Sequence, residues 1–438
     1  MRISQCMIVK NEEANIEKAL SWGRGILWEQ IVVDTGSTDR TVELAEAMGA
    51  KIYHFDWIDD FAAAKNFAIS KAEGDWIALL DADETFVPGD EKKLEALLKK
   101  IHHTDKDGVC TAWLQLREDN TISVASTQIR VFRNKPGLQY RRRIHEQLGY
   151  TDGRILHVAD ATEEISILHS GYRGEAWENK KQSGRNRKLI LKELEDHPGD
   201  YEMLGYLGDT YLSAGEDDEA IECFQSSIKA MPSALDEHDA RSASTFLYLM
   251  QLLEKKEEEE ELKRVYRKAV EYLPKEPDFD YVMGRHLAVC RQYTEGCSYL
   301  EKALDKLERF RCFNRAMYLS AHIQDAYEVI AYCGLMAGEA EKAVTFSIAV
   351  LKEDLYAMKP LVILLKAFRG NAAVPGVPPE QVLGVLQKLY DFSLLKDKMF
   401  CLKAAEYAEW TSLKQTITAM LTSQEMEAVK AAAGESEK

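Results

Sequence analysis

Two carboxylates separated by one residue follow an apolar segment early in the chain. The segment W-I-A-L-L, residues 76–80, runs directly into Asp81 and Asp83. On an extended chain, alternate side chains point to the same side, about 6.6 Å apart along the strand. Two carboxylates placed in this way can bind one divalent cation, and Mg²⁺ and Mn²⁺ often share such oxygen ligands with a substrate phosphate. A turn that begins a helix is the alternative interpretation, and the neighbouring residues help to decide.

Polar residues follow two further apolar segments in the same way. Asp34 comes directly after residues 30–33, and Lys10, Asn11 and Glu12 follow residues 3–9. If these segments are parallel strands, their carboxyl ends meet at one edge of the sheet, where open α/β sheets bind ligands. Three strand ends would then bring acidic, amide and ammonium groups together. A nucleoside diphosphate with its metal would use all three, so we favour a metal–phosphate site.

The segments around these residues alternate between strand-like and helix-like patterns. Ser37 or Thr38 is a candidate N-cap for the helix that would follow Asp34. Regular alternation predicts an α/β domain with a mixed, mostly parallel sheet, flanking helices and right-handed crossovers. The predicted strands are residues 3–9, 30–33, 51–54 and 75–80, the predicted helices are 12–20, 40–48 and 61–71, and further short strands fill 108–170.

From about residue 185 onward the pattern is almost entirely helical and repetitive. Small residues recur where paired helices would touch, and large apolar residues recur where successive pairs would stack. An ordinary helical bundle is the alternative. The fullest match to the tetratricopeptide pattern has Leu207, Gly208, Tyr211, Ala220, Phe224 and Pro232, and weaker matches contain Leu262, Tyr266, Ala269 and Pro274, then Gly284, Leu287, Leu300 and Ala303, then residues 331–344.

Composition places the chain among globular proteins. Its 438 residues are 46% hydrophobic and 29% charged, and this length suits two or three domains. The change of pattern near residue 185 divides them into an α/β domain at 1–184, all-α tetratricopeptide-like repeats at 185–369, and a linker with further helices at 370–438. The net charge of −17 argues against broad nucleic-acid binding. Scattered cysteines, no signal peptide and no membrane-length apolar run predict a reducing, cytoplasmic setting without a transmembrane segment. The charged run 255–261 is expected to be a solvated helix face.

Seven short motifs in the first part of the chain occur in an order typical of one enzyme family. They are M-I-V-K-N-E-E, V-V-D-T-G-S-T-D-R-T, D-F-A-A-A-K-N-F-A-I, G-D-W-I-A-L-L-D-A-D-E, R-V-F-R-N, R-I-H-E and I-L-H-S-G-Y. This series resembles the family 2 glycosyltransferases of the GT-A fold. With helical repeats behind it, the chain resembles a bacterial subset that includes enzymes similar to the peptide S-glycosyltransferases of glycosylated bacteriocins.

The resemblance implies a pocket for a UDP-sugar, with UDP-glucose as the default donor. It places Asp34 against the uracil or the ribose. Met7, Val9, Asn11 and Glu12 would line that pocket or brace it.

The resemblance also implies Mg²⁺ or Mn²⁺ at a DXD motif. Asp81 and Asp83 form this motif, with Asp83 as the stronger candidate for direct metal contact. His169 would complete the metal shell or touch the diphosphate. Lys65 and Asn66 lie in the segment that commonly approaches the donor. Many relatives have Arg at the position of Lys65, and Lys has the same charge but lacks the planar guanidinium group. A metal there would stabilise the leaving nucleoside diphosphate.

An inverting transfer also needs a base for the acceptor proton. The resemblance favours Glu146, because inverting relatives generally use a carboxylate, while His145 would suffice for a thiol that ionises near about pH 8.5. Neighbouring residues on a strand point to opposite faces, so we expect only one of the two to face the site. A base elsewhere is the third alternative. Arg130, Arg133 and residues 141–143 would add positive charge near the donor or simply form ion pairs.

The helical repeats favour a peptide or protein acceptor, because such arrays form concave surfaces that hold peptide segments. They are also a candidate surface for a homodimer. A cell-surface glycan or a lipid-linked acceptor is the alternative, and so is a catalytically silent scaffold that binds peptides. A sugar nucleotidyltransferase is disfavoured, because M-I-V-K-N-E-E lacks the glycine-rich phosphate loop of those enzymes.

Overall fold

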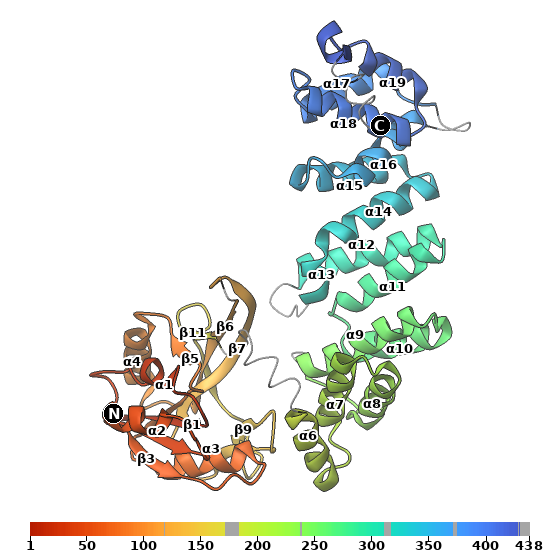
Figure 1. Ribbon diagram of the computed structural model, residues 1–438. Helices are drawn as coiled ribbons and strands as arrows, with labels where there is room; N and C mark the ends of the chain where they lie inside the picture. Colours follow the sequence, from red (N-terminus) through yellow and green to blue (C-terminus); the bar gives the residue numbers. More distant parts are fainter. Residues whose placement is uncertain are drawn as a thin grey trace. The chain divides into compact units, whose positions relative to one another are not determined.

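The computed structural model describes residues 1–117, 119–170, 184–236, 239–310, 317–370, 375–427 and 429. The chain divides into two compact units, Met1–Thr210 and Tyr211–Lys438 (Figure 1). The predicted succession of an α/β part and an all-helical part is confirmed. The boundaries at 184/185 and 369/370 stay a prediction. Two expectations lie partly outside the described residues, namely the linker at 371–374 and the end of I-L-H-S-G-Y at 171–172.

A mixed β-sheet forms the centre of the first unit. The strands are β1 (Ile3–Val9), β2 (Glu29–Asp34), β3 (Lys51–His54), β4 (Trp76–Leu79), β5 (Glu84–Phe86), β6 (Gly108–Leu116), β7 (Ile122–Arg133), β8 (Leu138–Arg141), β9 (Gln147–Tyr150), β10 (Val158–Asp160) and β11 (Ser166–His169). The main sheet has the order β3-β2-β1-β4-β7-β6-β11-β5, with β10 paired to β6, and β8 and β9 form a separate two-stranded sheet. The first four strands are parallel to one another, as predicted, and β7 runs antiparallel to β4 and β6.

Helices flank this sheet (Figure 1). They are α1 (Ile16–Ala19), α2 (Thr41–Ala47), α3 (Phe61–Ser70) and α4 (Asp90–Ile101). The helices α6 (Arg185–Asp196) and α7 (Tyr201–Ala214), which begins in this unit, follow the last strand along the chain. The predicted extent 12–20 of the first helix is wrong. Asn11 has a φ of 56°, and the backbone N–H of Glu12 donates to Thr41 on α2. The residues before α1 are therefore not helical, and they hydrogen-bond to the start of α2. The capping prediction is also wrong, because α2 begins after Arg40 and both Ser37 and Thr38 bind Asn11.

The central strand β4 is buried on both faces. Trp76 packs on one side of the sheet with Leu94 of α4, and Ile77 packs on the other side with Ala68 of α3. Burial of both faces explains why this strand reads as a continuous apolar run instead of alternating. The residues that follow β4 are therefore attached to a rigid, fully buried strand.

The second unit is a succession of helical hairpins. Its helices are α8 (Asp217–Ala230), α9 (Ala240–Lys255), α10 (Glu259–Tyr272), α11 (Asp278–Val289), α12 (Tyr293–Arg309), α13 (Met317–Ala321), α14 (Ile323–Ala337), α15 (Ala340–Glu353), α16 (Met358–Arg369), α17 (Pro379–Leu389), α18 (Leu395–Tyr407) and α19 (Thr411–Thr418). A Cβ on Gly284 would lie 2.6 Å from Leu300 Cγ, and a Cβ on Gly334 would lie 3.1 Å from Ala343 N. Small residues therefore allow paired helices to approach closely, as the repeat pattern predicts.

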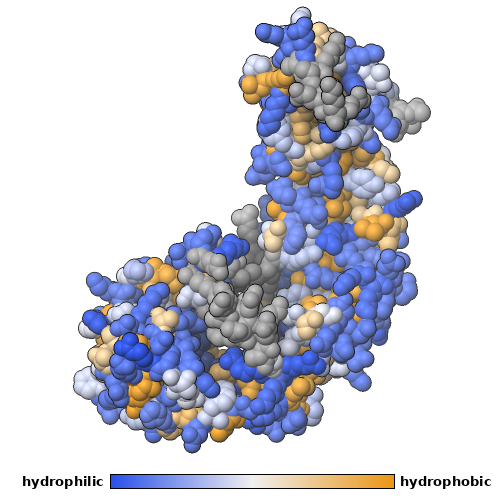
Figure 2. Space-filling view, in the orientation of Figure 1, coloured by the Kyte–Doolittle hydropathy of each residue, from blue (hydrophilic) through white to orange (hydrophobic). Residues whose placement is uncertain are grey.

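The visible surface is mostly hydrophilic, with apolar residues in small separate groups (Figure 2). Among the described residues, none of the helices combines the length and the apolar character needed to cross a membrane. The seven cysteines in the described ranges are free thiols.

Candidate active site

The predicted site residues lie at the carboxyl edge of the parallel strands. Val9 at the end of β1 pairs in register with Asp34 at the end of β2. On its other side β1 pairs with β4, whose last residue, Leu79, is opposite Cys6. The chain continues from β4 directly into Asp81 and the turn that holds Asp83. The loops after these three strands therefore leave the sheet at the same edge, as the sequence predicted.

Asp34 organises the loop that follows β2. It is 5% exposed, and its carboxylate accepts hydrogen bonds from the backbone N–H groups of Gly36 (3.1 Å) and Ser37 (3.0 Å). Burial acts to raise the pKa of Asp34, but the hydrogen bonds from Ser37 and Gly36 hold it below its usual value. His54 Nδ1, at the exposed end of β3, lies 3.5 Å from the same carboxylate. The carboxylate is thus a fixed anion at the sheet edge.

Asn11 and Glu12 brace the same loop. The side-chain oxygen of Asn11 accepts from Thr38 N at 2.8 Å, and the backbone N–H of Glu12 donates to Thr41 Oγ1 at 2.7 Å. Val9 is buried beside them and its carbonyl accepts from Thr35 N at 2.9 Å. These contacts brace the loop after β2, and a contact of Val9, Asn11 or Glu12 with the donor stays a prediction.

The D-A-D segment is a turn, so the prediction that strand alternation aligns its two aspartates is wrong. The strand ends at Leu79, and Glu84 N donates back to Asp81 O at 3.0 Å. In return, Asp81 N donates to Glu84 Oε2 at 3.0 Å. Glu84 is buried, with 1% of its surface exposed, and its hydrogen bond with Asp81 closes a turn. The extended strand therefore does not continue through Asp81 and Asp83.

Two cations hold Asp81. Arg130 on β7 lies 3.0 Å from Asp81 and 2.5 Å from Glu84, and Lys65 Nζ on α3 lies 3.7 Å from Asp81. Burial acts to lower the pKa of Lys65, but Asp81 and Glu146 raise it well above its usual value. Trp113 Nε1 donates to Glu84 at 2.7 Å. Glu84 and Trp113 were not predicted, although Glu84 is the last letter of the D-A-D-E motif.

Asp83 and His169 come together from different strands. His169 ends β11, and its Nε2 lies 3.4 Å from Asp83 Oδ2. The backbone supports this approach, because Ser170 N donates to Asp83 O at 3.0 Å. The imidazole packs against the Trp113 ring with centroids 4.5 Å apart. Of the three predicted metal ligands, the structure pairs Asp83 with His169, while Asp81 joins the two cations.

The candidate bases lie on a bend between β8 and β9, not on a strand. Glu146 is half-buried, and its Oε1 lies 2.5 Å from Lys65 Nζ. His145 is exposed, has a φ of 51°, and stacks on Tyr206 of α7 with ring centroids 3.6 Å apart. Only Glu146 therefore points toward Lys65 and Asp81. The bend, and not strand alternation, separates the two side chains.

The helices α6 and α7 anchor this bend through arginines. Arg142, with a φ of 75°, pairs with Asp200 at 3.0 Å and with Glu202. Arg143 pairs with Asp196 at 2.7 Å, and its backbone N–H donates to Glu193. These arginines consequently position the 142–146 bend.

Other predicted site residues have structural partners. Arg133 donates to the carbonyls of Ile101 and His102 at 2.9 and 2.7 Å, at the opposite end of β4 from the DAD turn, so its predicted role near the donor is wrong. Both polar atoms of the Asn66 side chain bind the backbone of Tyr140 at 2.9 Å. Asn66 therefore fixes β8 to α3, and a donor contact by it stays a prediction.

Comparisons with known proteins agree with this architecture. Residues 4–162 match the family model described as Glycosyl transferase family 2. A TPR repeat-containing protein of Synechococcus elongatus is 34% identical over 225 residues, which cover 49% of this chain and 53% of that protein. The SPbeta prophage-derived glycosyltransferase SunS of Bacillus subtilis is 26% identical over 225 residues, 51% of this chain and 52% of that protein.

Two solved structures show a weak likeness. The S. aureus TarS structure with UDP-GlcNAc has a TM-score of 0.36 and 14% identity, over 64% of this chain and 90% of that chain. The TPR protein YrrB has a TM-score of 0.35 and 15% identity, over 52% of this chain and 97% of that chain. Scores this low carry no argument about function.

The sequence matches and the fold define the class of each part of the chain. Residues 4–162 match a family 2 glycosyltransferase domain, and helical hairpins of the tetratricopeptide type follow it. The chain spans about half the length of the two curated relatives described above.

Proposed function

We propose that this chain is an inverting glycosyltransferase that moves a sugar from a UDP-sugar to a peptide or protein acceptor with Mg²⁺ or Mn²⁺. The observation that carries the proposal is the convergence of Asp83 with His169 and of Glu146 with Lys65 at the sheet edge that also holds Asp34. A metal-bridged nucleoside diphosphate needs anionic ligands, a cation and a nucleoside contact in one place. The family match supports the same chemistry.

The donor set at Asp83 and His169 fits a divalent cation. A carboxylate oxygen and an imidazole nitrogen 3.4 Å apart suit Mn²⁺, and Asp83 suits Mg²⁺ as well. When bound, such a cation stabilises the negative charge of the leaving UDP. Asp34 would meet the nucleoside from its fixed position in the β2 loop. Lys65 and Arg130 would face the diphosphate. The negative charge of the diphosphate would then partly replace Asp81 as the partner of these two cations.

Glu146 is the base in this proposal. The acceptor's nucleophilic atom attacks the anomeric carbon from the face opposite the UDP oxygen, and the electron pair of the breaking C–O bond leaves with UDP. The acceptor proton passes to the Glu146 carboxylate, which Lys65 holds in place. General-base catalysis of this kind contributes about 10²–10⁴-fold. The stacking of His145 on Tyr206 favours Glu146 over its neighbour.

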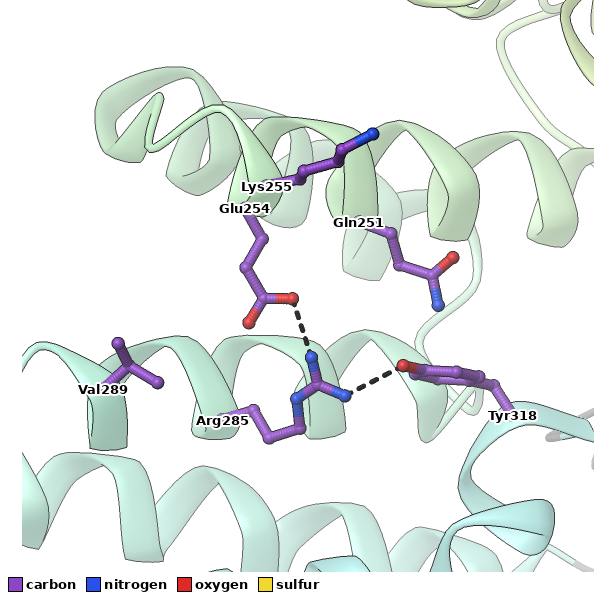
Figure 3. A pocket seen from close by; sticks show the side chains of 6 residues that line it. All are labelled: Gln251, Glu254, Lys255, Arg285, Val289 and Tyr318. Atoms are coloured by element: carbon purple, nitrogen blue, oxygen red, sulfur yellow. Dashed lines mark hydrogen bonds and ion pairs between the residues drawn. The ribbon is translucent and has the colours of Figure 1, made fainter. Parts of the chain in front are cut away.

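The second unit offers a groove for a peptide. A cavity of about 580 Å³ lies between α9, α11 and α13 and is lined by Gln251, Glu254, Lys255, Arg285, Val289 and Tyr318 (Figure 3). At its centre Arg285 donates to Glu254 at 3.1 Å and to Tyr318 at 2.9 Å. This mixture of charged, aromatic and apolar groups suits a peptide segment better than a uniform glycan. The proposal includes a cytoplasmic location, where free thiols persist.

Mass spectrometry of acceptors tests the proposed function. The purified chain is incubated with a panel of UDP-sugars, Mn²⁺ and a library of Cys-, Ser- and Thr-containing peptides. We expect release of UDP together with a hexose or N-acetylhexosamine mass increment on a peptide. If UDP is released only when a glycan or lipid acceptor is added, the acceptor is a glycan or a lipid and not a peptide. No UDP release with any donor, alongside tight peptide binding, would support the scaffold and contradict the proposal.

A further inference from the structure

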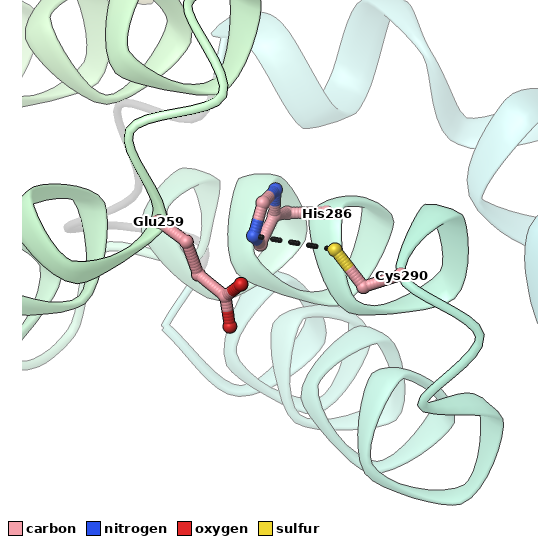
Figure 4. A group of neighbouring side chains, drawn as sticks. All are labelled: Glu259, His286 and Cys290. Carbon is pink, nitrogen blue, oxygen red and sulfur yellow. Dashed lines mark hydrogen bonds between the residues drawn. The ribbon is translucent and has the colours of Figure 1, made fainter.

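Three side chains of different chemistry converge in the second unit. They are Glu259 at the start of α10, His286 on α11, and Cys290, which caps the C-terminal end of α11 (Figure 4). One ligand atom from each lies within 4.8 Å of the other two. His286 Nε2 and Cys290 Sγ are 3.6 Å apart, since residues i and i+4 share one helix face. Glu259 belongs to the charged run 255–261, which the sequence indicated to be only a solvated face.

The ligand types and the His286–Cys290 spacing match a tetrahedral metal site, and the Glu259 carboxylate lies within 4.8 Å of both ligand atoms. Ligands at about 2.0–2.3 Å from Zn²⁺ in tetrahedral geometry lie about 3.3–3.8 Å from one another. The His286–Cys290 separation is within this range without movement. His286 is 6% exposed, while Cys290 is exposed, so the group is anchored on one side and open to solvent on the other.

One oxygen of the Glu259 carboxylate is already in an ion pair. Lys263 Nζ binds Glu259 Oε1 at 2.6 Å, but a carboxylate has a second oxygen, so the ion pair and a metal contact are compatible.

We propose that Glu259, His286 and Cys290 form a binding site for a thiolate-preferring transition-metal ion, best matched by Zn²⁺, with water in the fourth position. The thiol would release its proton to solvent on binding. Since Glu259 comes from α10 and the other two ligands come from α11 and its C-terminal cap, the ion would join two successive hairpins. The site is distinct in chemistry from the candidate active site, where carboxylates suit Mg²⁺ or Mn²⁺.

Calorimetric titration with ZnCl₂ tests this site in the full chain. The protein is first treated with EDTA and dialysed, and it carries Asp83→Asn so that the candidate active site does not contribute. We expect one Zn²⁺ per chain, and a rise in melting temperature of about 5 °C at 100-fold excess over Kd. Cys290→Ser and His286→Gln should each weaken binding by about 10- to 100-fold. Cys223→Ser on α8 is the matched control and should bind as tightly as its parent.

Cobalt spectroscopy separates a thiolate site from adventitious binding. Co²⁺ in the parent protein should give a thiolate-to-cobalt charge-transfer band together with intense visible bands of tetrahedral geometry. Cys290→Ser should lose the charge-transfer band, and Cys223→Ser should keep it. Absence of stoichiometric Zn²⁺ binding in the Asp83→Asn parent, or an unchanged affinity and spectrum in Cys290→Ser, would overturn the proposal. Neither result depends on glycosyltransferase activity.

Discussion

The imidazole ring of His145 lies flat on the phenol ring of Tyr206, with centroids 3.6 Å apart and planes 4° from parallel. The stack joins the 142–146 bend to α7, and Arg142 in the same bend pairs with Asp200, just before α7, and with Glu202 in its first turn. The residue after His145 is the candidate base Glu146. Aromatic stacking and partly buried ion pairs therefore position the base from outside the sheet that carries the other site residues.

Removal of the Tyr206 ring should slow turnover more than it weakens donor binding. Tyr206→Ala loses a stack worth about 0.5–1.5 kcal/mol, and misplacement of a catalytic group by about 1 Å can cost about 10²-fold in rate. We expect kcat to fall by about 10- to 100-fold with the KM for the UDP-sugar nearly unchanged. Tyr206→Phe keeps the ring and should retain most activity. Equal activity in the Ala and Phe variants would show that the stack has no positioning role.

Glu146→Gln should affect chemistry and leave donor affinity intact. The amide cannot accept the acceptor proton, so kcat should fall by about 10²–10⁴-fold. Calorimetry with UDP and Mn²⁺ should give a Kd within about 3-fold of the unaltered protein, because Lys65 keeps Asp81 as a partner. Glu163→Gln, at an exposed carboxylate, controls for the charge change. Parallel losses of turnover and UDP binding would indicate a structural role instead.

Gly284→Ala should destabilise the second unit by about 1–3 kcal/mol, because its Cβ would lie 2.6 Å from Leu300 Cγ and 2.9 Å from the backbone oxygen of Gly296. Gly384→Ala on α17 is the matched control, since nothing lies within 4 Å of its Cβ. There the gain in helix propensity should stabilise by up to about 1 kcal/mol. Urea unfolding followed by circular dichroism measures both. A stable Gly284→Ala variant would show that α11 and α12 do not pack this closely.

Asp278 should make stability depend on pH in an unusual direction. It is 3% exposed at the start of α11, and its carboxylate accepts from Leu319 N at 2.8 Å. Burial raises the pKa of Asp278 to about 6, from 3.8. The folded state therefore binds a proton more tightly than the unfolded state, so this stabilising contribution is complete below about pH 4 and is lost as the pH rises through 6. The shift corresponds to about 3 kcal/mol.

The Asp278→Asn variant isolates this effect. The difference in unfolding free energy between the variant and the unaltered chain should shift in favour of the variant between pH 4 and 7. Subtraction removes the contribution of other carboxylates, which lose stability toward acid. A difference that stays constant over this range would contradict the raised pKa.

The strands and their common edge could be predicted because they depend on local pattern. Buried parallel strands read as apolar runs, and β1 and β3 have the predicted bounds. The small residues at helix contacts, such as Gly284, were predictable for the same reason. The turn at Asp81–Asp83 was only the alternative interpretation, because the buried carboxylate of Glu84 that closes it could not be placed from the sequence.

The positioning of the base could not be predicted because its partners are distant in sequence. Arg142 and Glu202 are 60 residues apart in the sequence. No periodic pattern in the sequence predicts that the 142–146 bend contacts α7. Likewise, His286 and Cys290 share a helix spacing visible in the sequence, but Glu259 joins them only through the packing of α10 against α11. Side-chain pairs that cross elements require the fold to be known first.

Calorimetry with UDP tests the central claim, that Asp34 and Asp83 serve one cation-bridged pyrophosphate site at the sheet edge. The unaltered chain should bind UDP with a heat that requires Mn²⁺ and disappears with EDTA. Asp83→Asn should weaken Mn²⁺-dependent binding by about 10-fold or more while circular dichroism shows the helical repeats still folded. Absence of UDP binding to the unaltered chain in the presence of Mn²⁺, or equal binding by Asp83→Asn, would contradict the account.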